Sequence, residues 1–262
     1  MNARSALFDV YGDHLRSRGA RAPVSALVRL LAPLGIAAPA VRTAVSRMVR
    51  QGWLTPVRID GAPGYALTPR AAKRLDDAAA RIYRTRGESW DGTWHLLVVA
   101  PPVSRSARER VRAGLSFLGY GALDETTWIS PHAAEEVDAL LADEGARAER
   151  FTARHDGDSS ALVSRAWDLE SLARSYVRFL DDAAVIIASA GPRGEQSAFV
   201  ARTRLVHEWR KFLFLDPGLP AALLPVDWPG RKAAEHFDAE ATRLLPATTR
   251  FVDACLATRT EA

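Results

Sequence analysis

Apolar residues recur at three- and four-residue spacing through most of the first third of the chain, which is the spacing of one helix face. This pattern predicts helices over residues 5–16, 24–34 and 39–51. Gly35 ends the second helix, and Pro39 stands at the start of the third, where the missing backbone N–H of proline costs nothing. Two helices joined by so short a turn are typical of a helix-turn-helix.

A hairpin is predicted directly after the third helix. The runs WLTPVRI and GYALT are rich in β-prone residues, and the turn residues Asp60 and Gly61 lie between them. A further helix begins near Pro69 and extends to about residue 83. A helix-turn-helix followed by a two-stranded wing is a winged helix-turn-helix, and we expect this domain over residues 1–88.

The third helix has two chemically different faces. Its apolar positions form one stripe, consisting of Val41, Val45, Met48 and Val49. Its polar positions form the other side, consisting of Arg42, Thr43, Ser46, Arg47 and Arg50. Arginine can bind guanine edges and phosphates, and serine and threonine are short-range donors. We therefore predict that these five residues bind DNA, together with Arg58 near the tip of the wing. An ordinary solvated helix face would show the same pattern.

The distribution of charge favours the DNA-binding interpretation of that helix. Residues 1–90 contain 15 Arg and Lys against 6 Asp and Glu, whereas the remaining residues contain 20 against 25. Arginine used only for solubility would not be concentrated in this way. A basic first third on an acidic remainder is typical of a domain that binds a polyanion.

The middle of the chain predicts a second fold. A buried strand over residues 93–100 is followed by a helix over 104–118, and GALDETTWIS supplies one or two strands. A second helix over 131–142 and a strand over 149–156 complete the order β-α-β-β-α-β. This order is the split βαβ, or ferredoxin-like, arrangement. We assign it to residues 89–156, as a structural and dimerising module.

The last region, residues 157–262, is predicted to be helical, which makes the whole chain an α+β protein. The segments AWDLESLARSYVRFL and FVARTRLVHEWRKFLFL have apolar residues at helical spacing, and a final helix is expected over 231–256. Residues 189–197 form a loop between helices. The second segment also contains a basic, aromatic-flanked run, consisting of Arg202, Arg204, His207, Trp209, Arg210 and Lys211.

Several long segments identify a family. AAPAVRTAVSRMVRQGWL, YALTPRAAKRLDDAAARIYR and WDGTWHLLVV resemble the phenylacetate-degradation repressor family, the PaaX-type regulators. AWDLESLARSYVRFL and FVARTRLVHEWRKFLFLDPGLPAALLPVDWPG continue the similarity in the same order. The resemblance implies the same three domains. It also implies a homodimer that binds a pseudo-palindromic operator, represses catabolic genes and releases DNA on binding an acyl-coenzyme A, typically phenylacetyl-coenzyme A.

The basic run in the last region has two interpretations. The resemblance makes it a candidate effector site, because arginine and lysine bind phosphates such as those of coenzyme A. An apolar, partly aromatic lining would suit an aryl or acyl end, and Trp90, Trp94 and Trp128 are candidates for it. The alternative is a solvated helix face that pairs with the acidic remainder of the protein, and the sequence slightly favours this alternative. For the tryptophans, core packing is the commoner role.

An enzyme is the competing hypothesis for the middle domain. Small CRISPR adaptation nucleases have similar domains, and their activity depends on an acidic metal ligand at the end of the first strand. In this chain the strand runs into Ala100, Pro101 and Pro102, whose side chains bind no metal. The six histidines form no zinc-binding motif, and no nucleophile elbow or phosphate-binding loop is present. We expect no enzymatic activity, no metal and no cofactor.

The remaining features indicate a cytoplasmic protein. Cys255 is the only cysteine and lies in the apolar run FVDACLA, where a small buried core residue is expected. No stretch approaches about 18 consecutive apolar residues, and the first residues lack the continuous apolar block of a secretory signal.

Overall fold

The computed structural model describes residues 1–84, 90–190 and 194–257, and it has two compact units. The first unit consists of residues 1–80, 177–210 and 231–262. The second unit consists of residues 81–176 and 211–230. Both contain helices and an antiparallel sheet, as expected of an α+β protein. The boundary expected near residue 88 falls among residues 85–89, outside the described residues.

The first unit begins with a series of short helices. In chain order these are α1 (Ala3–Asp9), a π-helix η1 (Val10–Leu15), a 3-10 turn η2 (Arg16–Arg18), α2 (Val24–Leu31), a 3-10 turn η3 (Ala32–Leu34) and α3 (Ala38–Arg50). The helix predicted over residues 5–16 is therefore an α-helix that widens into a π-helix, a form that apolar spacing does not distinguish from an α-helix. Gly19 and Gly35 adopt left-handed conformations directly after η2 and η3, as expected of glycines at helix ends.

A three-stranded antiparallel sheet of order β1-β3-β2 accompanies these helices. It consists of β1 (Arg21–Pro23), β2 (Leu54–Ile59) and β3 (Ala62–Leu67), and α4 (Pro69–Arg84) follows it. Asp60 and Gly61 both have positive φ, which is the two-residue turn that matches strand twist in a hairpin. The predictions omitted β1. Its three residues pair with residues 64–66 of β3, and a Cβ at Gly64 would lie 2.8 Å from the Ala22 carbonyl oxygen.

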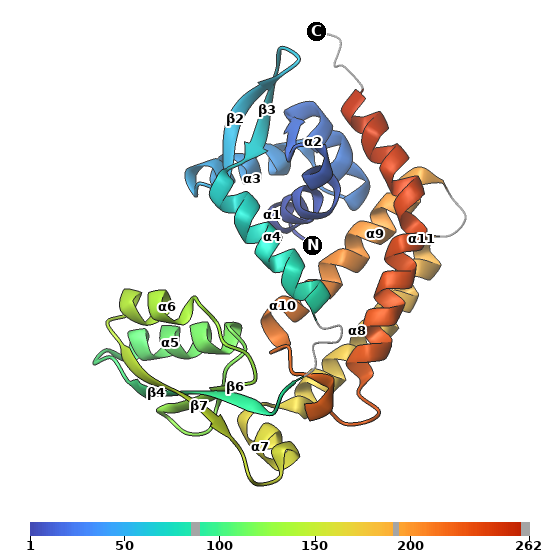
Figure 1. The fold of residues 1–262 in the computed structure, drawn as a ribbon. Helices are drawn as coiled ribbons and strands as arrows, with labels where there is room; N and C mark the ends of the chain where they lie inside the picture. Colours follow the sequence, from blue (N-terminus) through green and yellow to red (C-terminus); the bar gives the residue numbers. More distant parts are fainter. Residues whose placement is uncertain (85–89, 191–193, 258–262) are drawn as a thin grey trace. The chain divides into compact units, whose positions relative to one another are not determined.

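The core of the first unit draws on both ends of the chain. The helices α8 (Leu169–Ala190), α9 (Glu195–Trp209) and α11 (Pro229–Ala257) contribute to this unit, and α11 contains Pro246 in its interior. Buried residues of the first 71 positions, such as Leu7 and Val41, form one cluster with Phe199 of α9 and with Val252 and Cys255 of α11. Figure 1 shows α9 and α11 beside the N-terminal helices. Cys255 is a buried core residue, as predicted.

The second unit contains the predicted ferredoxin-like order. Its elements are β4 (Thr93–Ala100), α5 (Arg105–Phe117), β5 (Gly121–Ala122), β6 (Thr127–Ser130), α6 (Val137–Asp143) and β7 (Arg147–Arg154). The sheet has the order β5-β6-β4-β7, with every neighbouring pair antiparallel. This is the strand order of the split βαβ arrangement, so the prediction for the middle of the chain is confirmed.

The two faces of this sheet are covered differently. Leu97 and Val99 of β4 pack with Val111 of α5 and Leu141 of α6. The opposite face packs on α7 (Ser159–Ala166) and the 3-10 turn η4 (Ala221–Leu223), with Trp94 at the centre of that cluster. In Figure 1, α5 and α6 lie on one side of the sheet and α7 on the other. The short helix α10 (Phe212–Leu215) completes the unit.

Candidate DNA-binding interface and the basic run of α9

The helix α3 presents its polar stripe to solvent. Its buried residues, Val41, Ala44, Val45 and Met48, face the core that α1 and α2 also line. All five predicted DNA-binding residues of the helix are exposed: Arg42, Thr43, Ser46, Arg47 and Arg50. The three arginine side chains form no hydrogen bond or ion pair with any residue that the structure describes. The exposed face can therefore bind an external anion without breaking an internal contact.

The predicted wing residue Arg58 has a local partner. Its side chain is exposed, and its Nη1 donates a hydrogen bond of 2.7 Å to the carbonyl oxygen of Gly61 across the hairpin turn. This contact holds the guanidinium at the tip of the β2–β3 hairpin. A phosphate contact from Arg58 would compete with or add to that bond.

The basic run of α9 does not gather on one surface. Arg202 is 8% exposed and donates hydrogen bonds to both carboxylate oxygens of Asp13, at 2.8 and 2.7 Å. Its Nη1 also donates to the carbonyl oxygen of Ala241 in α11. Further along, His207 Nδ1 lies 2.8 Å from Asp9 Oδ2, and Arg210 Nε lies 2.6 Å from Asp9 Oδ1. These basic side chains already contact carboxylates inside the first unit.

The other members of the run have separate surroundings. Trp209 is buried between Phe179 and Phe237, with ring centroids 5.0 and 4.8 Å from theirs. Arg204 and Lys211 are exposed. Sequence reasoning considered pairing with the acidic remainder of the protein, but the acidic partners, Asp9 and Asp13, belong to the basic first third. Spacing along the chain gives no signal for such a pairing, because the partners are far apart in sequence.

Burial and neighbouring charges shift the pKa values of the groups that face α9. Burial lowers the pKa of His14 to about 4, so the imidazole is neutral at pH 7, and its Nε2 lies 3.0 Å from Thr203 Oγ1. Burial also raises the pKa of the Asp9 carboxyl above its ordinary value, although His207 and Arg210 oppose the shift. Burial acts in the same direction on Asp13, but His14, Arg202 and Arg16 together lower its pKa below the usual range.

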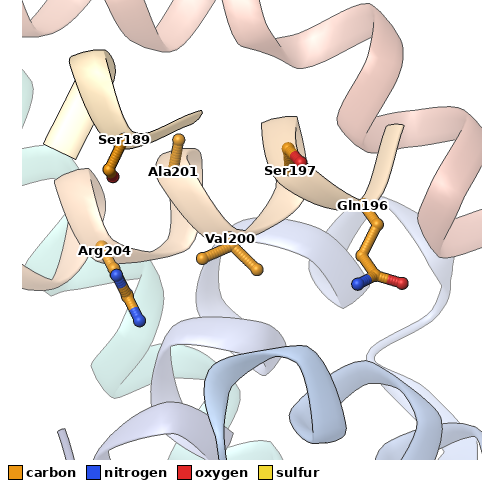
Figure 2. Close-up of a pocket in the computed structure, with 6 residues that line it drawn as sticks. All are labelled: Ser189, Gln196, Ser197, Val200, Ala201 and Arg204. Carbon is orange, nitrogen blue, oxygen red and sulfur yellow. The ribbon is translucent and has the colours of Figure 1, made fainter. Parts of the chain in front are cut away.

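A small pocket lies beside Arg204. It has a volume of about 170 Å³ and is lined by residues at the end of α8 and the first turns of α9, namely Ser189, Gln196, Ser197, Val200, Ala201 and Arg204. Figure 2 shows these side chains. The lining combines an exposed guanidinium with hydroxyl and amide groups, which suits an anionic or polar group rather than a large apolar one.

The tryptophans of the second unit pack in its core. Trp94 lies 5.0 Å from Trp90 and 6.2 Å from Trp167, measured between ring centroids. Trp128 belongs to the cluster on the opposite face of the sheet, below the guanidinium of Arg112. Trp94 and Trp128 therefore do not line one cavity. Both side chains pack in the hydrophobic core, on opposite faces of the sheet.

The end of β4 carries no metal-binding side chain. The strand ends at Ala100, which Pro101 and Pro102 follow, as the sequence indicated. Among the described residues, no three His, Cys, Asp or Glu side chains are grouped closely enough to hold a metal ion. Searching the same residues also finds no helix that is long and apolar enough to cross a membrane.

Comparisons with known proteins agree with the resemblance along the whole chain. Residues 2–71 match the model of a PaaX-like protein, residues 87–163 match the PaaX protein central Cas2-like domain, and residues 167–254 match the PaaX-like protein C-terminal domain. The chain belongs to the PaaX family. Its middle domain is thus Cas2-like, which agrees with the sheet order found here.

Two PaaX-family relatives show how far the similarity extends. The transcriptional repressor PaaX of Escherichia coli (strain K12) is 29% identical over 264 residues, covering 96% of this chain and 83% of that protein. The structure of the uncharacterized protein Rv0674 from Mycobacterium tuberculosis has a TM-score of 0.68 and 29% sequence identity. That comparison covers 97% of this chain and 98% of the other. The similarity therefore spans both compact units.

Proposed function

We propose that this protein is a DNA-binding transcriptional repressor whose α3 reads the major groove. The observation that supports this most directly is the exposed stripe on α3, with three arginines that have no partner in the described part of the chain. We assign α2 and α3 to a helix-turn-helix and the β2–β3 hairpin to its wing. The relative from Escherichia coli is named as a repressor rather than an enzyme, which agrees with this assignment.

We propose that the repressor acts as a twofold dimer held by the second unit. A single winged helix contacts few base pairs, so specific operators usually need two of them. The strand β7 lies at the edge of its sheet, with Phe151 52% exposed and Val98 of the neighbouring β4 40% exposed. An exposed edge with apolar side chains favours association of two copies. The operator is then pseudo-palindromic, with half-sites about one helical turn or a multiple apart.

We propose that the effector is an aryl- or acyl-coenzyme A such as phenylacetyl-coenzyme A. Its binding releases the repressor from the operator. The support is the family resemblance together with one local feature, the pocket beside Arg204. Arg204 is the residue of the basic run that we propose as a phosphate contact, because Arg202 and Arg210 already hold buried carboxylates. Binding must differ between the DNA-bound and released states for the ligand to switch the repressor.

Incubation with labelled duplexes and magnesium tests the proposed function. Duplexes are first selected from a random pool by the full-length protein, and their migration and integrity are then followed. A DNA-binding repressor retards a defined sequence and leaves it intact. Cleavage would support the metal-dependent nuclease that competes with this proposal, although no residue at the end of β4 favours it. Genome-wide binding followed by competition with thioesters would identify the operator and the effector.

A further inference from the structure

Six consecutive positions, Asp9–His14, contact two different parts of the first unit, and we call them the anchor segment. On one side, Asp9, Asp13 and His14 contact α9 through its ion pairs and through the hydroxyl of Thr203. On the other side, Val10 and Tyr11 are buried in the core that also contains the apolar face of α3. The anchor segment is therefore bonded to α9 and shares a core with the helix proposed to read DNA.

The anchor segment also holds the wing directly. The hydroxyl of Tyr11 donates a hydrogen bond of 2.9 Å to the carbonyl oxygen of Tyr65 in β3. Tyr11 is fully buried, so its ring cannot rotate away without opening the core. A displacement of the anchor segment would consequently disturb β3 and the core that it shares with α3.

Arg202 donates two hydrogen bonds to the anchor segment and a third to α11. Two go to the carboxylate of Asp13, and the third goes to the carbonyl oxygen of Ala241, in the turn of α11 that precedes Pro246. A bidentate pair between a guanidinium and a carboxylate fixes relative orientation as well as distance. Apolar contacts around it are non-directional and tolerate sliding. Arg202 is thus the residue that joins α9, α11 and the anchor segment in one geometry.

The burial of this pair makes its contribution to stability small and its contribution to geometry large. The side chains of Arg202 and Asp13 are 10% and 14% exposed. Desolvation of two charges offsets much of their attraction, so replacing a buried pair with apolar residues is often neutral for stability. The role of such a pair is best explained by conformational specificity, because it favours one relative orientation of the segments that it joins.

We propose that Arg202 is a positioning residue for DNA recognition, because it holds Asp13 between α9 and α11 and so fixes the orientation of the N-terminal helices relative to those two helices within the first unit. The inference rests on the proposed function, in which two copies of α3 must match two half-sites at once. Arg202 touches no DNA in this scheme. Loss of Arg202 changes how well the two copies of α3 fit a given spacing between half-sites. The contacts of each α3 with its own half-site remain intact.

The test measures spacing selectivity with duplexes that the wild-type protein has selected. One duplex contains a single half-site, a second contains two half-sites at the selected spacing, and a third lengthens that spacing by about 5 bp, half a helical turn. The variants are Arg202→Met and the double variant Asp13→Asn with Arg202→Met. Methionine fills the volume of the arginine stem, and the double variant leaves no buried charge unpaired if the single variant fails to fold.

The expected result is a fall of about tenfold in the ratio of affinities for the second and third duplexes. Affinity for the single half-site is retained, and Arg202→Lys, which keeps the charge, restores part of the ratio. Glu195→Gln is the matched control, because Glu195 forms an exposed ion pair with Arg250 that also joins α9 to α11. The control keeps the wild-type ratio.

Two results would overturn the inference. The first is a wild-type ratio in the double variant, which would mean that the pair does not set orientation. The second is an equal loss of affinity for all three duplexes, which would mean that the pair only supports folding. If the wild-type protein selects no duplex at all, the proposed function fails first and this inference fails with it.

Discussion

The imidazole of His14 and the ring of Phe199 lie with their centroids 5.0 Å apart in the core of the first unit. His14 belongs to the π-helix η1, and Phe199 belongs to α9 near the other end of the chain. Phe199 also packs on Phe251 of α11, with centroids 5.0 Å apart. The N-terminal helices therefore complete their core with aromatic side chains from the last third of the protein.

Phe199→Ala tests this shared core. Phe199 is fully buried, so its removal leaves a cavity and should lower the free energy of unfolding by about 3–5 kcal/mol. Urea unfolding followed by circular dichroism measures the change. Phe214→Ala is the control, because Phe214 is 69% exposed and its loss should change stability by less than about 0.5 kcal/mol. A loss below about 1 kcal/mol at Phe199 would contradict the shared core.

Removal of the α3 arginines tests the DNA-binding surface. Arg42→Ala or Arg47→Ala should cost about 1–3 kcal/mol of operator affinity where that residue contacts a guanine. Stability should remain unchanged, because both side chains are exposed and unpaired in the described residues. Fluorescence anisotropy with the selected operator measures affinity, and Arg243→Ala, which is exposed on α11, serves as the control. Unchanged binding by the double variant would remove α3 from the interface.

Acid should destabilise the first unit through His14. Burial lowers the pKa of His14 to about 4 from its ordinary 6.5, so between these values the unfolded chain binds more protons than the folded one. The free energy of unfolding therefore falls as pH drops through this window. Protonation of His14 accounts for a decrease of about 2 kcal/mol between pH 7 and pH 5.

His14→Gln removes that proton-linked term while keeping a side chain that can reach Thr203. The variant should lose about 2 kcal/mol less stability than the wild-type protein between pH 7 and pH 5. Urea titrations at both pH values give the comparison, and His155→Gln is the control at an exposed position. Identical pH dependence in wild type and His14→Gln would show that the imidazole is not held neutral by burial.

A titration of the operator complex tests the effector proposal. Aryl- and acyl-coenzyme A thioesters should lower operator affinity, whereas the corresponding free acids should have no effect, because they lack the phosphates that Arg204 would bind. Arg204→Ala should weaken the response at least several-fold without changing DNA affinity in the absence of thioester. A variant that responds like wild type would exclude the pocket beside Arg204, and a wild-type protein that responds to no thioester would exclude the effector class.

Local patterns predicted the local elements well. The hairpin turn at Asp60 and Gly61, the two faces of α3 and the individual strands and helices of the middle domain each follow from signals within a few residues of one another. The strand β1 was missed because three residues that include Pro23 show no alternation. The π-helix was missed because its apolar residues keep nearly helical spacing.

The assembly of the first unit lay beyond sequence reasoning. The basic run of α9 gave a correct signal of concentrated charge, but its partners could be identified only in three dimensions. Asp9 and Asp13 are isolated acids in a basic region, and no spacing rule connects them to Arg202 or Arg210. The exposed polar face of α3 was therefore predictable, whereas the contacts that join the N-terminal helices to α9 were not.

The construction of the first unit from both chain ends has a consequence for synthesis in the cell. Translation proceeds from the N-terminus, and domains generally fold as their residues emerge. Here the N-terminal helices lack Phe199, Val252 and the guanidinium of Arg202 until α9 and α11 have been made. A ribosome that stops early releases a chain in which the core beneath α3 is incomplete. Under the proposed function, such incomplete products would not compete with the full-length protein for DNA.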